Sequence, residues 1–196
     1  MIFDLDTKST NEKYKIMAQT IIPRPIAWVV TEDEGIVNIA PFSYFAPLSS
    51  TPPTVIISVG HKSDGTPKDT LANLRKNKKC TICIVDEAHL EQMHFSSKEL
   101  PKESSEMEEF KIETAKVLED FPPMVRDVPS AYFCEFNQEI NLGGDTIPLI
   151  LDVKQILVDD KYITNRERLT IDFLSIARIG KSYVRLGEGI EAPEFP

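Results

Sequence analysis

Between residues 38 and 53 the sequence combines Asn, Ser and Thr with Phe42, Tyr44, Phe45 and four prolines. Prolines restrict the backbone, so neighbouring N–H groups are held in fixed directions beside hydroxyl and aromatic side chains. A planar organic ligand needs this combination, with apolar cover for its faces and a few fixed hydrogen-bonding groups at its edge. The segment therefore predicts a binding loop for a flat ligand.

A second polar group, Lys68-Asp69-Thr70, stands at the start of a predicted helix. The preceding loop, residues 60–67, is rich in Gly, Ser, Asp and Pro, and we expect Asp69 or Thr70 to cap the helix. The unpaired amides of a helix N-terminus favour an anion, and a cation and a hydroxyl add to that preference. Lys68 and Thr70, together with Arg24 from an earlier segment, therefore predict a phosphate site.

Two short runs rich in Val and Ile, residues 25–31 and 54–59, flank the predicted binding loop and indicate buried strands. The first run leads into an acidic turn in which Gly35 is available for a positive φ. We expect this turn to return the chain as a β-hairpin. The hairpin would carry Asn38 and Ala40 to one rim of the sheet.

The other elements follow from caps, charge and alternation. A capping box that begins at Ser9 predicts a short N-terminal helix. Residues 80–85 predict another strand, whereas the charged, proline-containing stretch 86–126 predicts an irregular excursion with one helix capped at Ser105. The β pattern resumes over residues 131–158 with tight turns. Together these elements predict a mainly β fold with peripheral helices, built as an antiparallel barrel.

Four sequence blocks keep the order and approximate spacing of one known family over about the first half of the chain. They are Pro23-Arg24-Pro25-Ile26-Ala27, Asn38-Ile39-Ala40-Pro41-Phe42-Ser43-Tyr44-Phe45, Ser49-Ser50-Thr51-Pro52-Pro53 and Lys68-Asp69-Thr70-Leu71-Ala72-Asn73. The sequence resembles the flavin reductase-like family, whose members are similar to flavoredoxin. Residues 176–183 resemble the family's closing segment, and the tail from Gly187 is expected to fray. The resemblance implies an FMN-binding split β-barrel of antiparallel Greek-key type.

The resemblance also implies which residues bind the cofactor. Flavin contacts are expected from Ala27, Asn38, Ala40, Pro41, Phe42 and Ser43, and contacts to the ribityl chain and phosphate from Ser58, Lys68, Asp69 and Thr70. Arg24 is expected to assist at the phosphate. Asp69 would repel a phosphate unless its carboxylate capped backbone amides or bonded a ribityl hydroxyl.

The family resemblance further implies a homodimer with flavin near the subunit interface. FMN would take electrons from transiently bound NAD(P)H or from a reduced carrier protein, and pass them to free flavin or to another small-molecule or protein redox partner. No catalytic acid or base is expected, because electron and hydride transfer are chemistry of the cofactor.

Composition sets the remaining limits. A chain of 196 residues with 41% hydrophobic residues fits a single domain spanning residues 1–196. The formal net charge of −9 argues against a nucleic-acid partner, which is gripped through clustered Lys and Arg. The sequence shows no apolar run of ~20 residues to cross a membrane and no signal-peptide pattern at its start, so a cytoplasmic protein is expected.

Several residues are assigned to structure. Trp28 is interpreted as a core or dimer-contact residue, and the cysteines of the Cys80-Thr81-Ile82-Cys83 motif as core residues, because positions three apart in a strand point to opposite faces. The basic cluster at residues 75–79 is interpreted as a solvated helix end. His89 and His94 lack a convincing third ligand, so no metal site is expected.

Two alternatives to a flavin reductase stay open. The first is a non-enzymatic flavin-binding or electron-carrier protein without NAD(P)H turnover of its own. The second is a split-barrel oxidase of a small molecule such as a pyridoxine phosphate, which the first and last of the four blocks disfavour.

Overall fold

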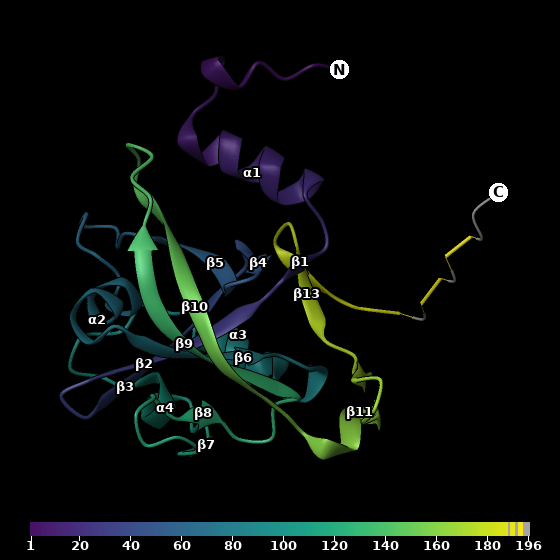
Figure 1. The fold of residues 1–196 in the computed structure, drawn as a ribbon. Helices are drawn as coiled ribbons and strands as arrows, with labels where there is room; N and C mark the ends of the chain where they lie inside the picture. The colour runs from purple at the N-terminus through teal and green to yellow at the C-terminus, as the bar shows by residue number, and fades with distance from the viewer. Residues whose placement is uncertain (188, 191, 194–196) are drawn as a thin grey trace.

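The computed structural model describes residues 1–187, 189–190 and 192–193, and it is built around a strongly curved antiparallel sheet (Figure 1). In these residues the helices are η1 (Leu5–Thr7), α1 (Thr10–Thr20), α2 (Asp69–Asn77), η2 (Glu87–His89), α3 (Leu90–Phe95), α4 (Glu106–Glu109) and η3 (Asp160–Tyr162). The strands are β1 (Arg24–Pro25), β2 (Ala27–Asp33), β3 (Ile36–Phe42), β4 (Phe45–Ser50), β5 (Pro53–Gly60), β6 (Lys79–Ile84), β7 (Thr114–Ala115), β8 (Met124–Val125), β9 (Ser130–Glu139), β10 (Thr146–Val158), β11 (Ile163–Asn165), β12 (Thr170–Ile171), β13 (Ile176–Ile179) and β14 (Ser182–Arg185).

The main sheet has the strand order β3-β2-β6-β9-β10-β5-β4, and every neighbouring pair is antiparallel. β3 and β4 lie at opposite ends of this order, yet only Ser43 and Tyr44 separate them in the chain. Two residues reach only a few ångströms each, so the sheet has to curl until its two edges meet. The predicted mainly β barrel is therefore confirmed.

The loop predicted over residues 38–53 was wrong, because most of that segment is strand, and ligand binding by the segment stays a prediction. β3 continues to Phe42, and β4 pairs with β5. The misleading signal came from the prolines. Pro41 and Pro47 lie in strands at the two ends of the sheet order, where a missing N–H breaks no ladder between inner strands.

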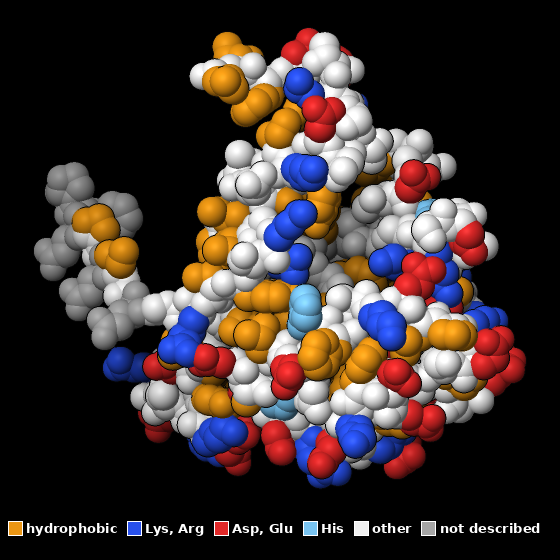
Figure 2. Space-filling view, turned by 180° about the vertical axis from the view of Figure 1, so that it is seen from behind, with side chains coloured by type: hydrophobic (Ala, Val, Ile, Leu, Met, Phe, Trp, Pro, Cys, Tyr) orange, Lys and Arg blue, Asp and Glu red, His pale blue; other side chains and the backbone are white. Residues whose placement is uncertain are grey.

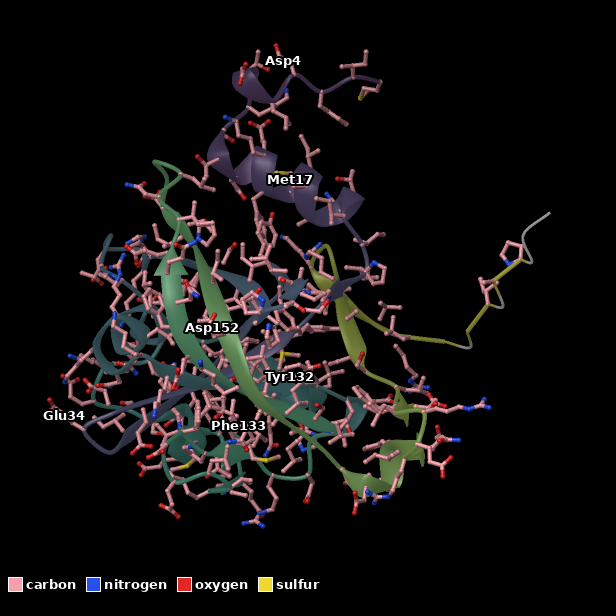
Figure 3. The ribbon with its side chains drawn as sticks, viewed as in Figure 1. Asp4, Met17, Glu34, Tyr132, Phe133 and Asp152 are labelled. Carbon is pink, nitrogen blue, oxygen red and sulfur yellow. The ribbon has the colours of Figure 1, made fainter. Side chains whose placement is uncertain are left out.

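The predicted hairpin before this segment is confirmed. β2 and β3 pair from Ala27 opposite Phe42 to Asp33 opposite Ile36. The turn between them is made by Glu34 and Gly35, which both have positive φ, at 52° and 82°. Figure 3 shows Glu34 at the tip of this hairpin. Asn38 and Ala40 share one face of β3, since strand side chains alternate.

Two buried clusters lie on opposite sides of β2 and β6. Trp28 and Cys83 belong to one cluster, and Ala27 and Cys80 belong to the other, with the leucines of α2. The core assignments of Trp28 and of the Cys80 to Cys83 motif are thus confirmed. All three cysteines are free and buried, and burial raises the pKa of Cys83 to about 12.

The predicted solvated helix end is confirmed at α2, where Arg75 binds Glu139 and Lys76 binds Asp33 and Glu34. The excursion 86–126 differs from its prediction, because it holds two short α-helices and the β7–β8 pair in the described residues. Ser105 occupies the predicted N-cap position of α4, but its side chain makes no capping hydrogen bond.

Instead of capping α4, the Ser105 hydroxyl donates to the carbonyl of Val37 at 2.5 Å. A contact that distant along the chain leaves no local pattern.

The predicted N-terminal helix is confirmed as α1, with Ser9 and Glu12 forming a capping box. Helix α1 stands above the barrel, as Figure 1 shows, and Met17 marks it in Figure 3. The predicted fraying tail includes Glu188, Glu191 and residues 194–196, which lie outside the described residues. Within the described part of the chain, the helices are too short or too polar to span a membrane.

Candidate functional site

A buried set of amide and hydroxyl groups links β3 to helix α2. The Asn38 Nδ2 donates to Thr70 Oγ1 at 3.0 Å and is 3.4 Å from Thr31 Oγ1, to which Asn73 Nδ2 also donates at 3.1 Å. The four residues are at most 7% exposed. Because the Thr70 oxygen accepts from Asn38, its own proton is available for another acceptor. The network therefore leaves a hydroxyl donor in the first turn of α2.

The N-terminus of α2 carries no side-chain cap, and Lys68 occupies the N-cap position. The prediction that Asp69 or Thr70 would cap the helix was wrong, because both side chains have other partners. Asp69 accepts from Lys62 Nζ at 2.9 and 3.0 Å, and Thr70 accepts from Asn38. The first amides of α2 are left for an anion. Lys62 also offsets the carboxylate charge that would repel one.

A cavity of about 80 Å³ lies at this helix start. Its lining comes from β3, the loop between β5 and α2, the first turn of α2, the segment after α3, and α4: Asn38, Ala40, Lys62, Lys68, Asp69, Thr70, Ser96, Ser97, Lys98, Glu99, Leu100 and Glu106. Five of the predicted cofactor-binding residues thus share one cavity. The fold joins part of the predicted ring segment to the predicted phosphate site.

Residues 17–170 match the family model described as flavin reductase like domain. The chain belongs to the flavin reductase-like family. This confirms the resemblance that the four sequence blocks carried.

Solved structures of similar fold agree with this family. Nitrilotriacetate monooxygenase component B from Bacillus cereus is 28% identical, with a TM-score of 0.87 over 98% of each chain. A putative flavin reductase with a split barrel domain from Shewanella frigidimarina is 18% identical, with a TM-score of 0.80 over 100% of each chain. An FMN-binding protein from Thermus thermophilus is 19% identical, with a TM-score of 0.74 over 88% of this chain and 91% of that one. The flavin reductase-like chain therefore has a split β-barrel fold.

In this flavin reductase-like chain, Glu106 is a site residue that sequence reasoning missed. The residue is 5% exposed and lines the cavity, and its carboxylate accepts from the Ile39 N–H at 2.9 Å. Burial raises the pKa of Glu106, and Asp69 adds to the rise while Lys62 opposes it. A glutamate in a Glu-rich stretch gives no sequence signal, since its partner is 67 positions away.

The free energy of unfolding of the Glu106→Gln variant, measured relative to that of the wild type, should increase as pH increases. A carboxyl whose folded pKa is raised contributes stability below its ordinary value of 4.5, and that contribution is lost as pH rises through the folded pKa. Glutamine keeps an acceptor for Ile39 without the charge. Denaturant unfolding of both proteins from about pH 4 to 8 measures the difference. A stability difference that changes as little with pH as that of the exposed control Glu108→Gln would contradict the raised pKa of Glu106.

Arg24 and Ser43 lie apart from the cavity at α2. Arg24 is 5% exposed and donates to the carbonyls of Ala18 and Ile21, the latter at 3.0 Å, and its Nε is 3.4 Å from Ser43 Oγ. Its Nη2 is buried without a hydrogen-bond partner in the described residues. The guanidinium therefore ties the end of α1 to the predicted ring segment. Its role at the phosphate stays a prediction.

The other predicted contacts are outside the cavity too. The side chains of Ala27 and Phe42 are buried in the barrel core, at 0% and 8% exposure. Pro41 points away from Ala40 by strand alternation, and the Ser58 N–H donates to the carbonyl of Tyr44 at 2.9 Å. Flavin contacts by Ala27, Pro41, Phe42 and Ser58 stay predictions. A ligand could reach only the backbone groups and the partly exposed atoms of these residues.

Proposed function

We propose that the protein binds FMN, with its phosphate at the start of α2 and its ring over the end of β3. The observation that carries this proposal is the uncapped α2 N-terminus, where Lys68 and the free proton of Thr70 converge beside Asn38 and Ala40. One helix start with two such donors suits one phosphate group. Family membership and the fold shared with an FMN-binding protein support the same cofactor.

The flavin would serve oxidoreduction. FMN takes electrons from NAD(P)H or a reduced carrier protein and delivers them to free flavin or another redox partner. The chain positions the ring and excludes water, and the cofactor supplies the redox chemistry when bound. The proposed location is the cytoplasm, since three free cysteines suit a reducing compartment.

A homodimer is part of the proposal. A cavity of about 80 Å³ is far below the roughly 300 Å³ or more of a typical ligand pocket, so it accommodates only the phosphate end. The flavin ring then needs apolar cover from outside this cavity. Met17 in α1, Ile21 and Ile22 just after it, and Leu48 in β4 are 39–58% exposed. Their apolar surface suits a second copy of the chain.

Steady-state oxidation of NADH and NADPH with added FMN tests the reductase activity. We expect oxidation that depends on both protein and FMN, followed as the loss of nicotinamide absorbance. Boiled protein and protein without FMN are the controls. A protein that retains FMN yet oxidises neither donor would reject the reductase and leave the electron-carrier alternative.

A further inference from the structure

Glu106 brings a buried carboxyl group to the cavity in which the FMN phosphate is proposed to bind. The residue belongs to α4, and it lines the cavity of about 80 Å³ together with Lys68 and Thr70. In a cavity this small, a phosphate group held by Lys68 and Thr70 also lies against the Glu106 carboxyl. An ionised carboxylate only accepts hydrogen bonds, as a phosphate oxygen does, so the two groups repel each other unless a proton lies between them.

The Glu106 side chain is tied to β3 and is not free to turn away from a phosphate. Its Oε2 accepts from the Ile39 N–H at 2.9 Å, and the neighbouring Ser105 hydroxyl donates to the carbonyl of Val37 at 2.5 Å. Both hydrogen bonds are buried. Swinging the carboxyl group out to water would leave the Ile39 N–H buried without an acceptor, which is costly. Protonation removes the charge and keeps the contact with β3.

The charges on the other walls of the cavity balance that of an ionised Glu106. The other charged lining residues are Lys62, Lys68, Asp69, Lys98 and Glu99, and β3 contributes no charged side chain. On the helix of Glu106 itself, Glu108 and Glu109 are exposed. Three lysines thus face three carboxylates when Glu106 is ionised, and the lining gains one positive charge when Glu106 is protonated. A phosphate with a charge of about −1.5 to −2 favours the protonated form.

The electrostatic surroundings of Glu106 act in the same direction. Burial raises the pKa of Glu106 in the free protein, the Ile39 N–H and Lys62 oppose the rise, and Asp69 adds to it. A phosphate beside the carboxyl would raise this pKa further. The chain has a formal net charge of −9, and Figure 2 shows Lys and Arg interspersed with Asp and Glu over the lower part of one face. No broad positive field on that face offsets the local repulsion.

We propose that Glu106 is a phosphate-binding residue, which takes up a proton from solvent as the FMN phosphate enters the cavity and donates it in a hydrogen bond to a phosphate oxygen. The inference rests on the proposed function and adds a third donor to Lys68 and Thr70. No bond of the cofactor forms or breaks, and the proton stays on the carboxyl oxygen. FMN affinity is then coupled to pH through one buried group.

The direction of this coupling follows from the proton count. The complex holds one proton more than the free protein wherever Glu106 is ionised before FMN binds and protonated afterwards. FMN affinity should therefore fall as pH rises through the pKa of Glu106 in the free protein toward its pKa in the complex. The fall is up to about tenfold for each pH unit.

Titration of flavin fluorescence from about pH 5 to 9 tests the proposal with wild type, Glu106→Gln and Glu99→Gln. Glutamine is a neutral donor at every pH, like the protonated carboxyl. Dividing the FMN dissociation constant of the wild type by that of Glu106→Gln removes the titration of the phosphate itself. This ratio should rise at least about tenfold from the acidic to the alkaline end. The control Glu99→Gln removes an exposed carboxylate from the same lining, and its ratio should change less than about threefold.

A second measurement does not depend on how well the variant folds. Calorimetric titration with FMN in two buffers of different ionisation enthalpy gives the number of protons taken up. Above about pH 7 the phosphate is largely ionised already, so net uptake there comes from the protein. Wild-type protein should take up a proton in part of this series, up to one per FMN, and Glu106→Gln should take up fewer.

A ratio for Glu106→Gln that stays within about threefold over the whole pH series would overturn the proposal. So would equal proton uptake by the wild type and this variant, or an equal pH effect in Glu99→Gln. Failure of the wild type to bind FMN at any pH would instead defeat the proposed function. The same series with inorganic phosphate would then decide the role of Glu106, and phosphate binding without a pH-dependent difference, or no phosphate binding, would overturn it.

Discussion

Replacing Lys68 with alanine and Thr70 with valine is expected to weaken FMN binding by about 100-fold. Lys68 sits at the N-cap of α2, and the Thr70 hydroxyl keeps a proton to donate because Asn38 occupies its oxygen. Each charge-assisted contact to a phosphate contributes ~1.5 kcal/mol or more, and every 1.4 kcal/mol is about tenfold in affinity. Titration of flavin fluorescence with wild-type and variant protein measures the change.

The matched control for this variant is Lys161→Ala/Thr164→Val, which makes the same chemical changes at η3 and β11, outside the lining of the α2 cavity. Its FMN affinity should equal that of the wild type. Valine keeps the shape of Thr70, so the fold should survive, and thermal unfolding checks this. FMN affinity of the Lys68/Thr70 variant within about threefold of wild type would show that the phosphate binds elsewhere.

Replacing Trp28 with alanine is expected to lower the free energy of unfolding by ~3–5 kcal/mol, as for other large buried aromatic residues. Trp28 is 0% exposed and is the largest fully buried side chain in the described residues. Its Nε1 donates to Ser96 Oγ at 2.9 Å, and Ser96 in turn donates to the carbonyl of Met93. Alanine would leave a cavity and a buried hydroxyl with an unused acceptor.

Denaturant unfolding measures this loss, with two comparison variants. Trp28→Phe keeps most of the volume and loses only the indole hydrogen bond, so it should cost ~1–2 kcal/mol. Ser96→Ala removes the partner from the other side and should cost a similar amount. If Trp28→Ala cost less than ~1 kcal/mol, the expected contribution of this buried side chain to stability would be contradicted.

The sequence was sufficient for features set by neighbouring residues. The capping box at Ser9 predicts α1, and the positive φ allowed at Gly35 predicts the β2–β3 hairpin, because each depends on residues a few positions apart. Alternation over residues 131–158 predicts β9 and β10 for the same reason. The family resemblance then supplied the split barrel, which local patterns alone leave as one of several antiparallel barrels.

The features that sequence reasoning misplaced depend on distant partners. Asp69 does not cap α2 because Lys62 holds it, and Thr70 does not because Asn38 donates to it from 32 positions away. Pro41 indicated a loop, but it sits in a strand at the end of the sheet order. Glu106 reaches Ile39 only once α4 lies against β3. These positions are settled by tertiary contacts, and the candidate site is built from several of them.

The identity of the flavin that the protein retains tests the proposed FMN site most directly. Purified protein is incubated with equal amounts of FMN and FAD, separated from free flavin by gel filtration, and denatured, and the released flavin is identified by chromatography. We expect release of FMN from the wild type and no retained FMN in the Lys68→Ala/Thr70→Val variant. Release of FAD, or of no flavin at all, would contradict the proposed single-phosphate site at the start of α2.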